Sequence, residues 1–139
     1  MSFRLLLPFL LIAWTSAAVA LDATDQGLYN VIHRDGHTTD TTFMAAIVQD
    51  RWHLYRQMPN RAWEDVTCEG DCALVESSMF DLTRFFLADD LKQISPTCIH
   101  NKAFAFCRYA RRVGSAVPAY VFVVLEAPRP VHVNLGRVQ

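Results

Sequence analysis

Runs of β-branched, aromatic and other apolar residues predict short β-strands in the first half of the chain. The segment 27–33 is rich in β-branched and aromatic residues, so we expect a strand there. The segment 42–48 is almost entirely apolar and fits a strand or a helix by its period, but Asp50-Arg51 interrupts it just before another β-like segment, so we expect a strand there too. Between them stands Asp35-Gly36, a pair typical of hairpin turns. The two strands are therefore expected to pair antiparallel.

A second hairpin is expected further along. The segments 52–57 and 62–67 flank a turn centred on Pro59 and Asn60. If Gln57 pairs with Ala62, Arg56 faces Trp63 across the ribbon, where a guanidinium over an indole ring is attracted by a cation–π interaction. The same face of this ribbon then collects Trp52, Leu54, Arg56 and Trp63.

The period of the pattern changes after residue 72. Apolar residues recur at spacings of three and four, as in an amphipathic helix, at Val75, Met79, Phe80, Leu82, Phe85, Phe86 and Leu87. Ser78 with Asp81 resembles a helix start, and Pro96 disfavours helix at the residue before it. One helix from about Ser78 to about Lys92 is predicted.

Strands return in the last third of the chain. The segments 103–109 and 117–125 are predicted strands, and the second has no polar residue in 119–125, as expected of a central strand covered on both faces. Apolar residues alternate with polar ones over 131–136, and the prolines at 128 and 130 favour a sheet margin for this last strand. We therefore expect an α+β fold: a small, mostly antiparallel sheet of about six or seven strands, one main amphipathic helix and disulfide staples.

Residues 1–20 have the pattern of a cleavable secretory signal peptide. Arg4 precedes ten apolar residues, 5–14, and Ala18-Val19-Ala20 has small residues at the positions that a signal peptidase reads. Ten apolar residues are too few to cross a bilayer, which takes about 20. The sequence thus predicts export to the periplasm or the extracellular space and one domain over 21–139.

Charge and composition exclude some partners. After loss of Arg4 with the predicted signal peptide, twelve basic and fourteen acidic residues remain, a formal charge of about −2. Nucleic-acid binding needs a net positive field, so we expect no nucleic-acid partner. No membrane span is expected after cleavage.

The cysteines are four in number, all in the predicted exported part: Cys68, Cys72, Cys98 and Cys107. An even count in an oxidising compartment predicts two disulfides. Three pairings are open, and the local scheme, Cys68 with Cys72 and Cys98 with Cys107, is slightly favoured. The absence of a Cys-x-x-Cys pair argues against a four-thiolate zinc site.

Catalytic motifs are missing. Gly114-Ser115 does not continue as the Gly-x-Ser-x-Gly of α/β-hydrolases, and no glycine-rich phosphate loop is present. His33 and His37 bracket a turn, with Asp40 beyond, and two imidazoles with a carboxylate are residue types that bind metal ions. Their spacing suits a metal site on a helix. The Asp-Gly pair argues against a helix there, so solvated turn histidines are favoured over a metal site. No metal and no cofactor are predicted.

Arginine and aromatic residues are favoured anchors of protein interfaces. The densest charge is the cluster Arg108, Arg111 and Arg112 beside Tyr109, suited to a carboxylate or phosphate on a partner. The candidate partner-binding residues are Trp52, Tyr55, Arg56, Trp63, Arg108, Tyr109, Arg111 and Arg112.

The leading functional hypothesis is a small exported, non-enzymatic binding protein, for instance an inhibitor or immunity-type protein whose partner is another protein. One alternative is a small secreted hydrolase with a histidine site assembled in the fold, from residues such as His37, His53 or His100. A second alternative is a structural component of an envelope assembly.

Overall fold

The computed structural model describes residues 19–67, 72–114 and 117–138. Nearly all of the predicted signal peptide lies outside the described residues, and so does Cys68. Neither described helix approaches the length and apolarity that a membrane-spanning helix requires.

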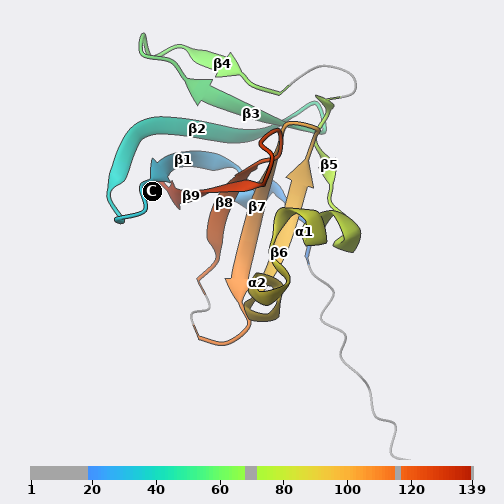
Figure 1. Cartoon of the computed structure of the whole chain (residues 1–139). Helices are drawn as coiled ribbons and strands as arrows, with labels where there is room; N and C mark the ends of the chain where they lie inside the picture. Colours follow the sequence, from blue (N-terminus) through green and yellow to red (C-terminus); the bar gives the residue numbers. More distant parts are fainter. Residues whose placement is uncertain (1–18, 68–71, 115–116, 139) are drawn as a thin grey trace, which may run out of the picture.

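The described chain forms one curved antiparallel sheet with two short helices on its outer side (Figure 1). In chain order the elements are a 3-10 turn η1 (Ala23–Asp25), strands β1 (Gly27–Ile32), β2 (Thr38–Val48), β3 (Arg51–Gln57), β4 (Trp63–Asp65) and β5 (Val75–Glu76), helices α1 (Met79–Phe85) and α2 (Ala88–Gln93), and strands β6 (Ile94–His100), β7 (Phe104–Arg111), β8 (Ala119–Val124) and β9 (Val131–Arg137).

The predicted α+β fold with six or seven strands is wrong, because the protein is mostly β. Nine strands pair in the order β4-β3-β2-β1-β9-β8-β7-β6-β5, and every neighbouring pair is antiparallel. The two helices have only seven and six residues. The pattern predicted neither β5, with two residues, nor β6.

Strand β6 follows α2 directly and contains Pro96. A proline cannot donate a ladder hydrogen bond, so it is tolerated where a strand has no neighbour on that side. Strand β5 pairs only with Ile99 and His100, at the far end of β6. Pro96 therefore lies on an open edge, and β6 forms despite it.

Strand β9 lies in the middle of the sheet, between β1 and β8. The predicted place at the sheet margin is therefore wrong. Pro128 and Pro130 stand in the turn before the strand, where the lack of a backbone N–H costs no ladder hydrogen bond. The prediction of a central strand covered on both faces is right for β8, since Tyr120 and Val121 belong to cores on opposite faces.

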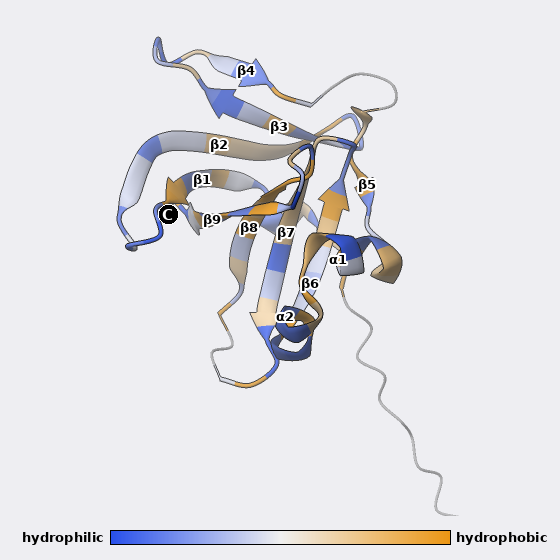
Figure 2. Cartoon of the chain, in the orientation of Figure 1, coloured by the Kyte–Doolittle hydropathy of each residue, from blue (hydrophilic) through white to orange (hydrophobic). Residues whose placement is uncertain are grey.

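The sheet curls into a half-barrel whose concave side is packed with aromatic rings. Trp52 of β3 and Phe106 of β7 lie 6.5 Å apart between ring centroids, although four strands separate β3 from β7 in the sheet. Phe43 of β2 stacks on Phe122 of β8 at 5.3 Å. Side chains of strands this far apart in the sheet can touch only when the sheet is strongly curved. Figure 2 shows hydrophilic residues on α2 and at the hairpin tips, away from this core.

The second core lies between the outer face of β6 to β8 and helix α1. The predicted continuous helix is broken here: Phe86 and Leu87 have extended backbones between α1 and α2. Phe85 and Phe86 are both buried, and adjacent residues of a helix point about 100° apart. The break turns both rings toward the sheet, at the cost of exposing Leu87.

A disulfide joins Cys98 to Cys107, which are direct partners across β6 and β7 with Cα atoms 4.1 Å apart. This half of the predicted local scheme is confirmed. It also removes two of the four thiolates that a zinc site would need. The pairing of Cys68 with Cys72 stays a prediction, because Cys68 lies outside the described residues.

A buried carboxylate holds the N-terminal segment on the half-barrel. Asp25 is only 1% exposed, and its carboxylate accepts hydrogen bonds from Arg108 Nη1 at 2.7 Å, the Tyr120 hydroxyl at 2.8 Å and the Asp22 N–H at 2.9 Å. The Tyr29 hydroxyl donates to the Asp25 carbonyl. Burial raises the pKa of both tyrosines, so both phenols stay protonated as donors at neutral pH.

We expect Asp25→Ala to lower the free energy of unfolding by about 3–5 kcal/mol, because it leaves the half-buried Arg108 cation and the Tyr120 hydroxyl without their acceptor. Urea denaturation of wild type and variant measures the loss. Asp40→Ala is the matched control, since Asp40 is exposed on β2. Equal losses in the two variants contradict a central role for the Asp25 carboxylate.

Candidate functional site

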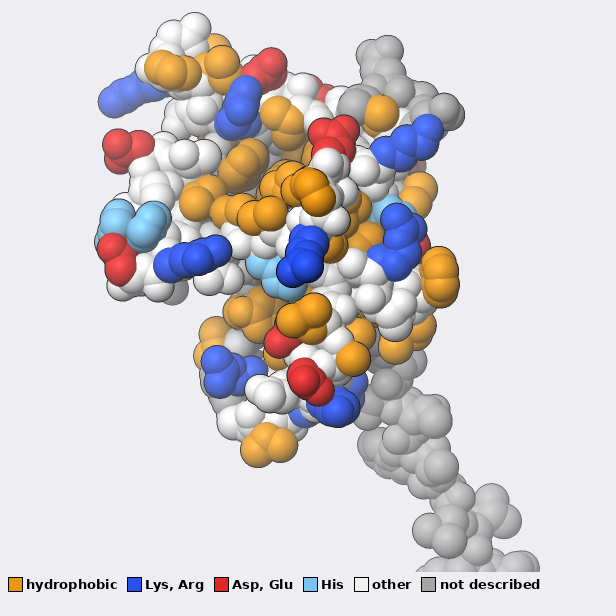
Figure 3. Space-filling model, in the orientation of Figure 1, with side chains coloured by type: hydrophobic (Ala, Val, Ile, Leu, Met, Phe, Trp, Pro, Cys, Tyr) orange, Lys and Arg blue, Asp and Glu red, His pale blue; other side chains and the backbone are white. Residues whose placement is uncertain are grey.

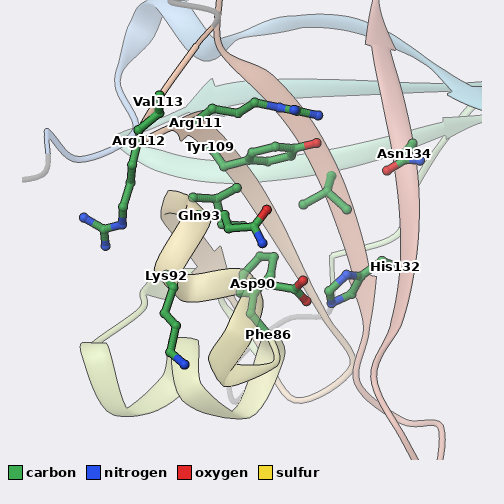
Figure 4. Close-up of a pocket in the computed structure, with 12 residues that line it drawn as sticks. Phe86, Asp90, Lys92, Gln93, Tyr109, Arg111, Arg112, Val113, His132 and Asn134 are labelled. Carbon is green, nitrogen blue, oxygen red and sulfur yellow. The ribbon is translucent and has the colours of Figure 1, made fainter.

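A pocket of about 420 Å³ opens on the outer side of the sheet, between α2 and strands β7, β8 and β9 (Figure 4). This volume is typical of a small-ligand site. Its lining residues are Phe86, Asp90, Lys92, Gln93, Ile94, Tyr109, Arg111, Arg112, Val113, Val121, His132 and Asn134.

Strand register builds the floor of the pocket. Side chains of directly paired residues share one face of a sheet. Cys107, Val121 and Asn134 are successive partners across β7, β8 and β9, and Tyr109 lies two residues beyond Cys107 on that face. His132 of β9 is two residues from Asn134, also on that face. The floor therefore carries an apolar centre between polar side chains of β7 and β9.

Arg112 fixes the helical wall of the pocket. Its backbone N–H donates to the Gln93 carbonyl at 2.8 Å, and its Nε donates to the Leu91 carbonyl at 3.2 Å. A cation at the C-terminal end of a helix is also favoured by the helix dipole. Arg112 is thus occupied in holding α2 against β7, and Figure 4 shows its guanidinium pointing away from the pocket.

His132 closes the lower end. Its Nε2–H donates to the Phe85 carbonyl at 2.6 Å, and its ring lies 5.0 Å from the Phe86 ring. With the proton on Nε2, the Nδ1 atom is left as an acceptor. In Figure 4 the Asp90 carboxylate points toward this ring from α2.

Arg111 is the cation of the pocket that remains available. Within the described residues its guanidinium has no hydrogen bond or ion pair, whereas Lys92 is paired with Asp89 at 3.1 Å. Figure 4 shows the Arg111 side chain lying along the Tyr109 ring at the upper rim. An unpaired guanidinium beside an aromatic ring is suited to a carboxylate.

The predicted arginine cluster is therefore divided. Arg111 and Tyr109 line the pocket, Arg112 supports it, and Arg108 is on the concave side, where it pairs with Asp25 and donates to the Val19 carbonyl at 2.6 Å. Alternation along β7 sends Arg108 to the face opposite Tyr109. As a structural arginine, Arg108 is not offered to a partner.

The predicted candidates on β3 and β4 do not join this site. The hairpin register places Gln57 opposite Trp63 and Arg56 opposite Glu64, one residue from the predicted pairing. Arg56 accordingly forms an ion pair with Glu64 at 3.0 Å, and the predicted stacking of Arg56 on Trp63 is wrong. The Met58 N–H donates to the Ala62 carbonyl at 2.8 Å, so Met58 and not Gln57 lies opposite Ala62, and Arg61 adopts a φ of +65° in the turn between them.

The other two aromatic candidates on β3 face opposite sides of the sheet. Trp52 packs in the concave core against Phe106. Tyr55 is on the outer face, where its ring stacks with His53 at 6.1 Å, and His53 Nδ1 lies 2.9 Å from an Asp65 oxygen. Burial opposes ionisation of Asp65, but hydrogen bonds from His53 and Thr67 outweigh it and lower the pKa of Asp65.

Sequence reasoning missed the polar residues that α2 and β9 add to the pocket: Asp90, Gln93, His132 and Asn134. Their only signal was the alternation that puts His132 and Asn134 on one side of the last strand. Placing that side beside Tyr109 requires the register of β8 with both β7 and β9, which the sequence pattern did not specify.

A second polar cluster lies where β5 leads into α1. Ser77 Oγ is 2.7 Å from His100 Nδ1, and His100 Nε2 is 3.9 Å from Asp81 Oδ1. The His100 ring packs edge-on to Phe85 at 5.2 Å. Sequence reasoning named His100 as a candidate without these partners, because Ser77 and His100 are 23 residues apart.

No protein-family model matches the chain, and neither a curated protein nor a solved structure shows a significant match.

Asp81 predicts an acid-sensitive helix start. The Ser78 backbone N–H at 2.8 Å and hydroxyl at 2.9 Å hydrogen-bond its carboxylate and lower the pKa of Asp81 below the ordinary 3.8, against a smaller opposing effect of burial. The stabilisation is full above about pH 4 and is lost as the pH falls through the lowered pKa. We expect Asp81→Asn to lower the melting temperature most at neutral pH and to approach wild type near pH 2.

Melting temperatures between pH 2 and 7 test this expectation. Asp40→Asn, on an exposed strand position, is the control. A constant difference between wild type and Asp81→Asn over the whole range contradicts it.

Proposed function

We propose that this chain is an exported binding protein whose pocket between α2 and β9 receives an acidic side chain of a partner protein, as in an inhibitor or immunity-type complex. The observation that carries the proposal is Arg111, the pocket cation without a partner among the described residues, lying along Tyr109. An arginine fork binds a carboxylate with two parallel hydrogen bonds.

The lining favours a single carboxylate on an apolar stem. Tyr109, Phe86 and Val121 offer apolar surface for the stem, while Gln93 and Asn134 supply amide groups around the charge. Asp90, at the far end of the pocket, repels a second negative charge. A glutamate of the partner fits this distribution better than a phosphate does.

An exposed apolar side chain at the pocket supports a protein rather than a small molecule as the ligand. Val113 lines the pocket and is 88% exposed. Apolar residues around a central charged anchor exclude water from it in protein interfaces. Val113 is suited to this role beside Arg111.

We also propose that the protein is exported. The Cys98–Cys107 disulfide is compatible with an oxidising compartment. The predicted signal peptide at residues 1–20 supplies the route to the periplasm or the extracellular space, and the partner is sought there.

Reversing the charge of Arg111 in the pocket is expected to weaken partner binding. Wild type, Arg111→Glu and Arg51→Glu are each used as bait for proteins of the native exported compartment. Arg51 is an exposed arginine of β3 outside the pocket, so its variant carries the same change of net charge. A partner held by wild type and Arg51→Glu should lose at least about tenfold in affinity for Arg111→Glu, because a buried charge pair becomes a repulsion.

The captured protein then provides its own check. Changing its contacting glutamate to glutamine should weaken wild-type binding, with no further loss for Arg111→Glu. A partner that binds Arg111→Glu as tightly as wild type refutes the pocket as its site.

The Ser77–His100 contact favours a second candidate function, a hydrolase. When Nε2 carries the ring proton, the Ser77 hydroxyl donates to Nδ1, which is the relation of a nucleophile to its general base. The contact of His100 with a carboxylate that would orient it is weaker. Asp81 lies 3.9 Å from the His100 ring, and its carboxylate already accepts hydrogen bonds from Ser78, where it caps α1. For this reason the binding protein remains our first proposal.

A fluorophosphonate reagent tests the second candidate. In a hydrolase the Ser77 oxygen attacks the phosphorus of the reagent, and fluoride ion leaves. The hydroxyl proton of Ser77 passes to His100, and the serine keeps a phosphonyl group. For a hydrolase we expect mass spectrometry to find this group on wild type and on Ser95→Ala, a control serine of β6, but not on Ser77→Ala or His100→Gln. Absence of label on wild type eliminates the candidate.

A further inference from the structure

The tip of the β1–β2 hairpin gathers two histidines and a carboxylate. The His33 N–H donates to the His37 carbonyl at 2.9 Å, and the Gly36 N–H donates to the His33 carbonyl at 2.8 Å. Gly36 has φ +92°, a conformation that residues with a side chain rarely adopt. This tight turn places His33 and His37 opposite each other with Asp35 between them.

The three side chains converge on one point. His33 Nδ1 lies 3.3 Å from Asp35 Oδ1, and His37 Nδ1 contacts the same oxygen. The two imidazole rings stack with centroids 5.0 Å apart, and one ligand atom from each residue lies within 4.8 Å of the other two. Figure 3 shows a pair of histidine side chains beside an acidic one at the left edge of the molecule, open to solvent.

We propose that His33, Asp35 and His37 bind a divalent transition metal ion of the zinc class. Zinc bonds of about 2.0–2.2 Å to nitrogen and oxygen put tetrahedral ligands about 3.3 Å apart. The His33–Asp35 distance already has this value, and His37 needs only a small side-chain movement. Because the side chains are 59–62% exposed, such movement meets little resistance.

The donor set selects the class of ion. Two imidazole nitrogens favour zinc, copper or nickel, whereas calcium and magnesium prefer oxygen ligands. Three protein ligands leave a fourth position for water or for a group of a partner molecule. The site lies in the turn between β1 and β2 and shares no residue with the pocket, so it is independent of the proposed binding function.

The turn explains why the sequence pattern argued against this site. An Asp-Gly pair excludes the helix on which two histidines four residues apart would share a face. The same pair folds the chain back, so that His33 and His37 meet across the hairpin instead.

Calorimetric titration of the chelator-treated, oxidised protein with zinc chloride at pH 7.5 tests the proposal. We expect one equivalent to bind to wild type. His33→Ala and His37→Ala should each weaken zinc affinity by at least about tenfold, because each removes a ligand atom. His53→Ala should bind as wild type does, and it is a matched control because His53 also pairs with an aspartate, at 2.9 Å, but belongs to no cluster of three such ligands among the described residues.

A second readout uses thermal stability. Zinc should raise the melting temperature of wild type and His53→Ala, but not of the two hairpin variants. Failure of wild type to take up zinc, or unchanged affinity in both hairpin variants, overturns the proposal.

Discussion

The ion pair between Asp25 and Arg108 fastens the N-terminal segment to the concave side of the half-barrel. Its hydrogen bonds reach β7 through Arg108 and β8 through Tyr120, and the Asp25 carbonyl reaches β1 through Tyr29. Arg137 of β9 adds donors to the carbonyls of Thr24 and Gln26. A buried ion pair contributes little net stability compared with apolar packing, but it strongly disfavours arrangements that leave either charge alone. The pair therefore specifies how the segment and the two halves of the sheet fit together.

The curvature of the sheet gives its two faces different roles, a filled core on the concave side and a pocket on the outer side. The concave side is filled by rings from β1, β2, β3, β7 and β8. On the outer side, α1 and α2 cover β6 to β8 and stop short of β9. The pocket lies at this boundary, where His132 links β9 to the end of α1 and Arg112 links β7 to the end of α2. The break after Phe85 contributes to the same boundary, because it directs Phe86 into the pocket.

Some arginines already have hydrogen-bond acceptors within the fold, and these are structural, whereas one is available to a partner. Arg108 has Asp25, Arg56 has Glu64, and Arg112 holds the end of α2, so each already has acceptors within the fold. Arg111 has none among the described residues and borders a cavity. Sequence composition shows only that arginines are numerous. At the hairpin tip, by contrast, the Nδ1 atoms of both His33 and His37 contact one Asp35 oxygen, and this convergence is the basis of the proposed metal site.

The sequence alone predicted most of the strands, favoured the Cys98–Cys107 bridge over two other pairings and located the start of α1, because β-propensity, short loop spacing and a capping serine act over a few residues. It also pointed to Tyr109 and Arg111. Only the tertiary structure decided the rest. The partners of β9 lie 7 to 15 residues earlier in β8 but 102 to 108 residues earlier in β1, and no local pattern specifies the pairing with β1. The same holds for Arg108, whose acceptor is 83 residues earlier in the chain. Burial on both sides of a curved sheet, not residue type, assigned one arginine of the cluster to the core and left another at the pocket.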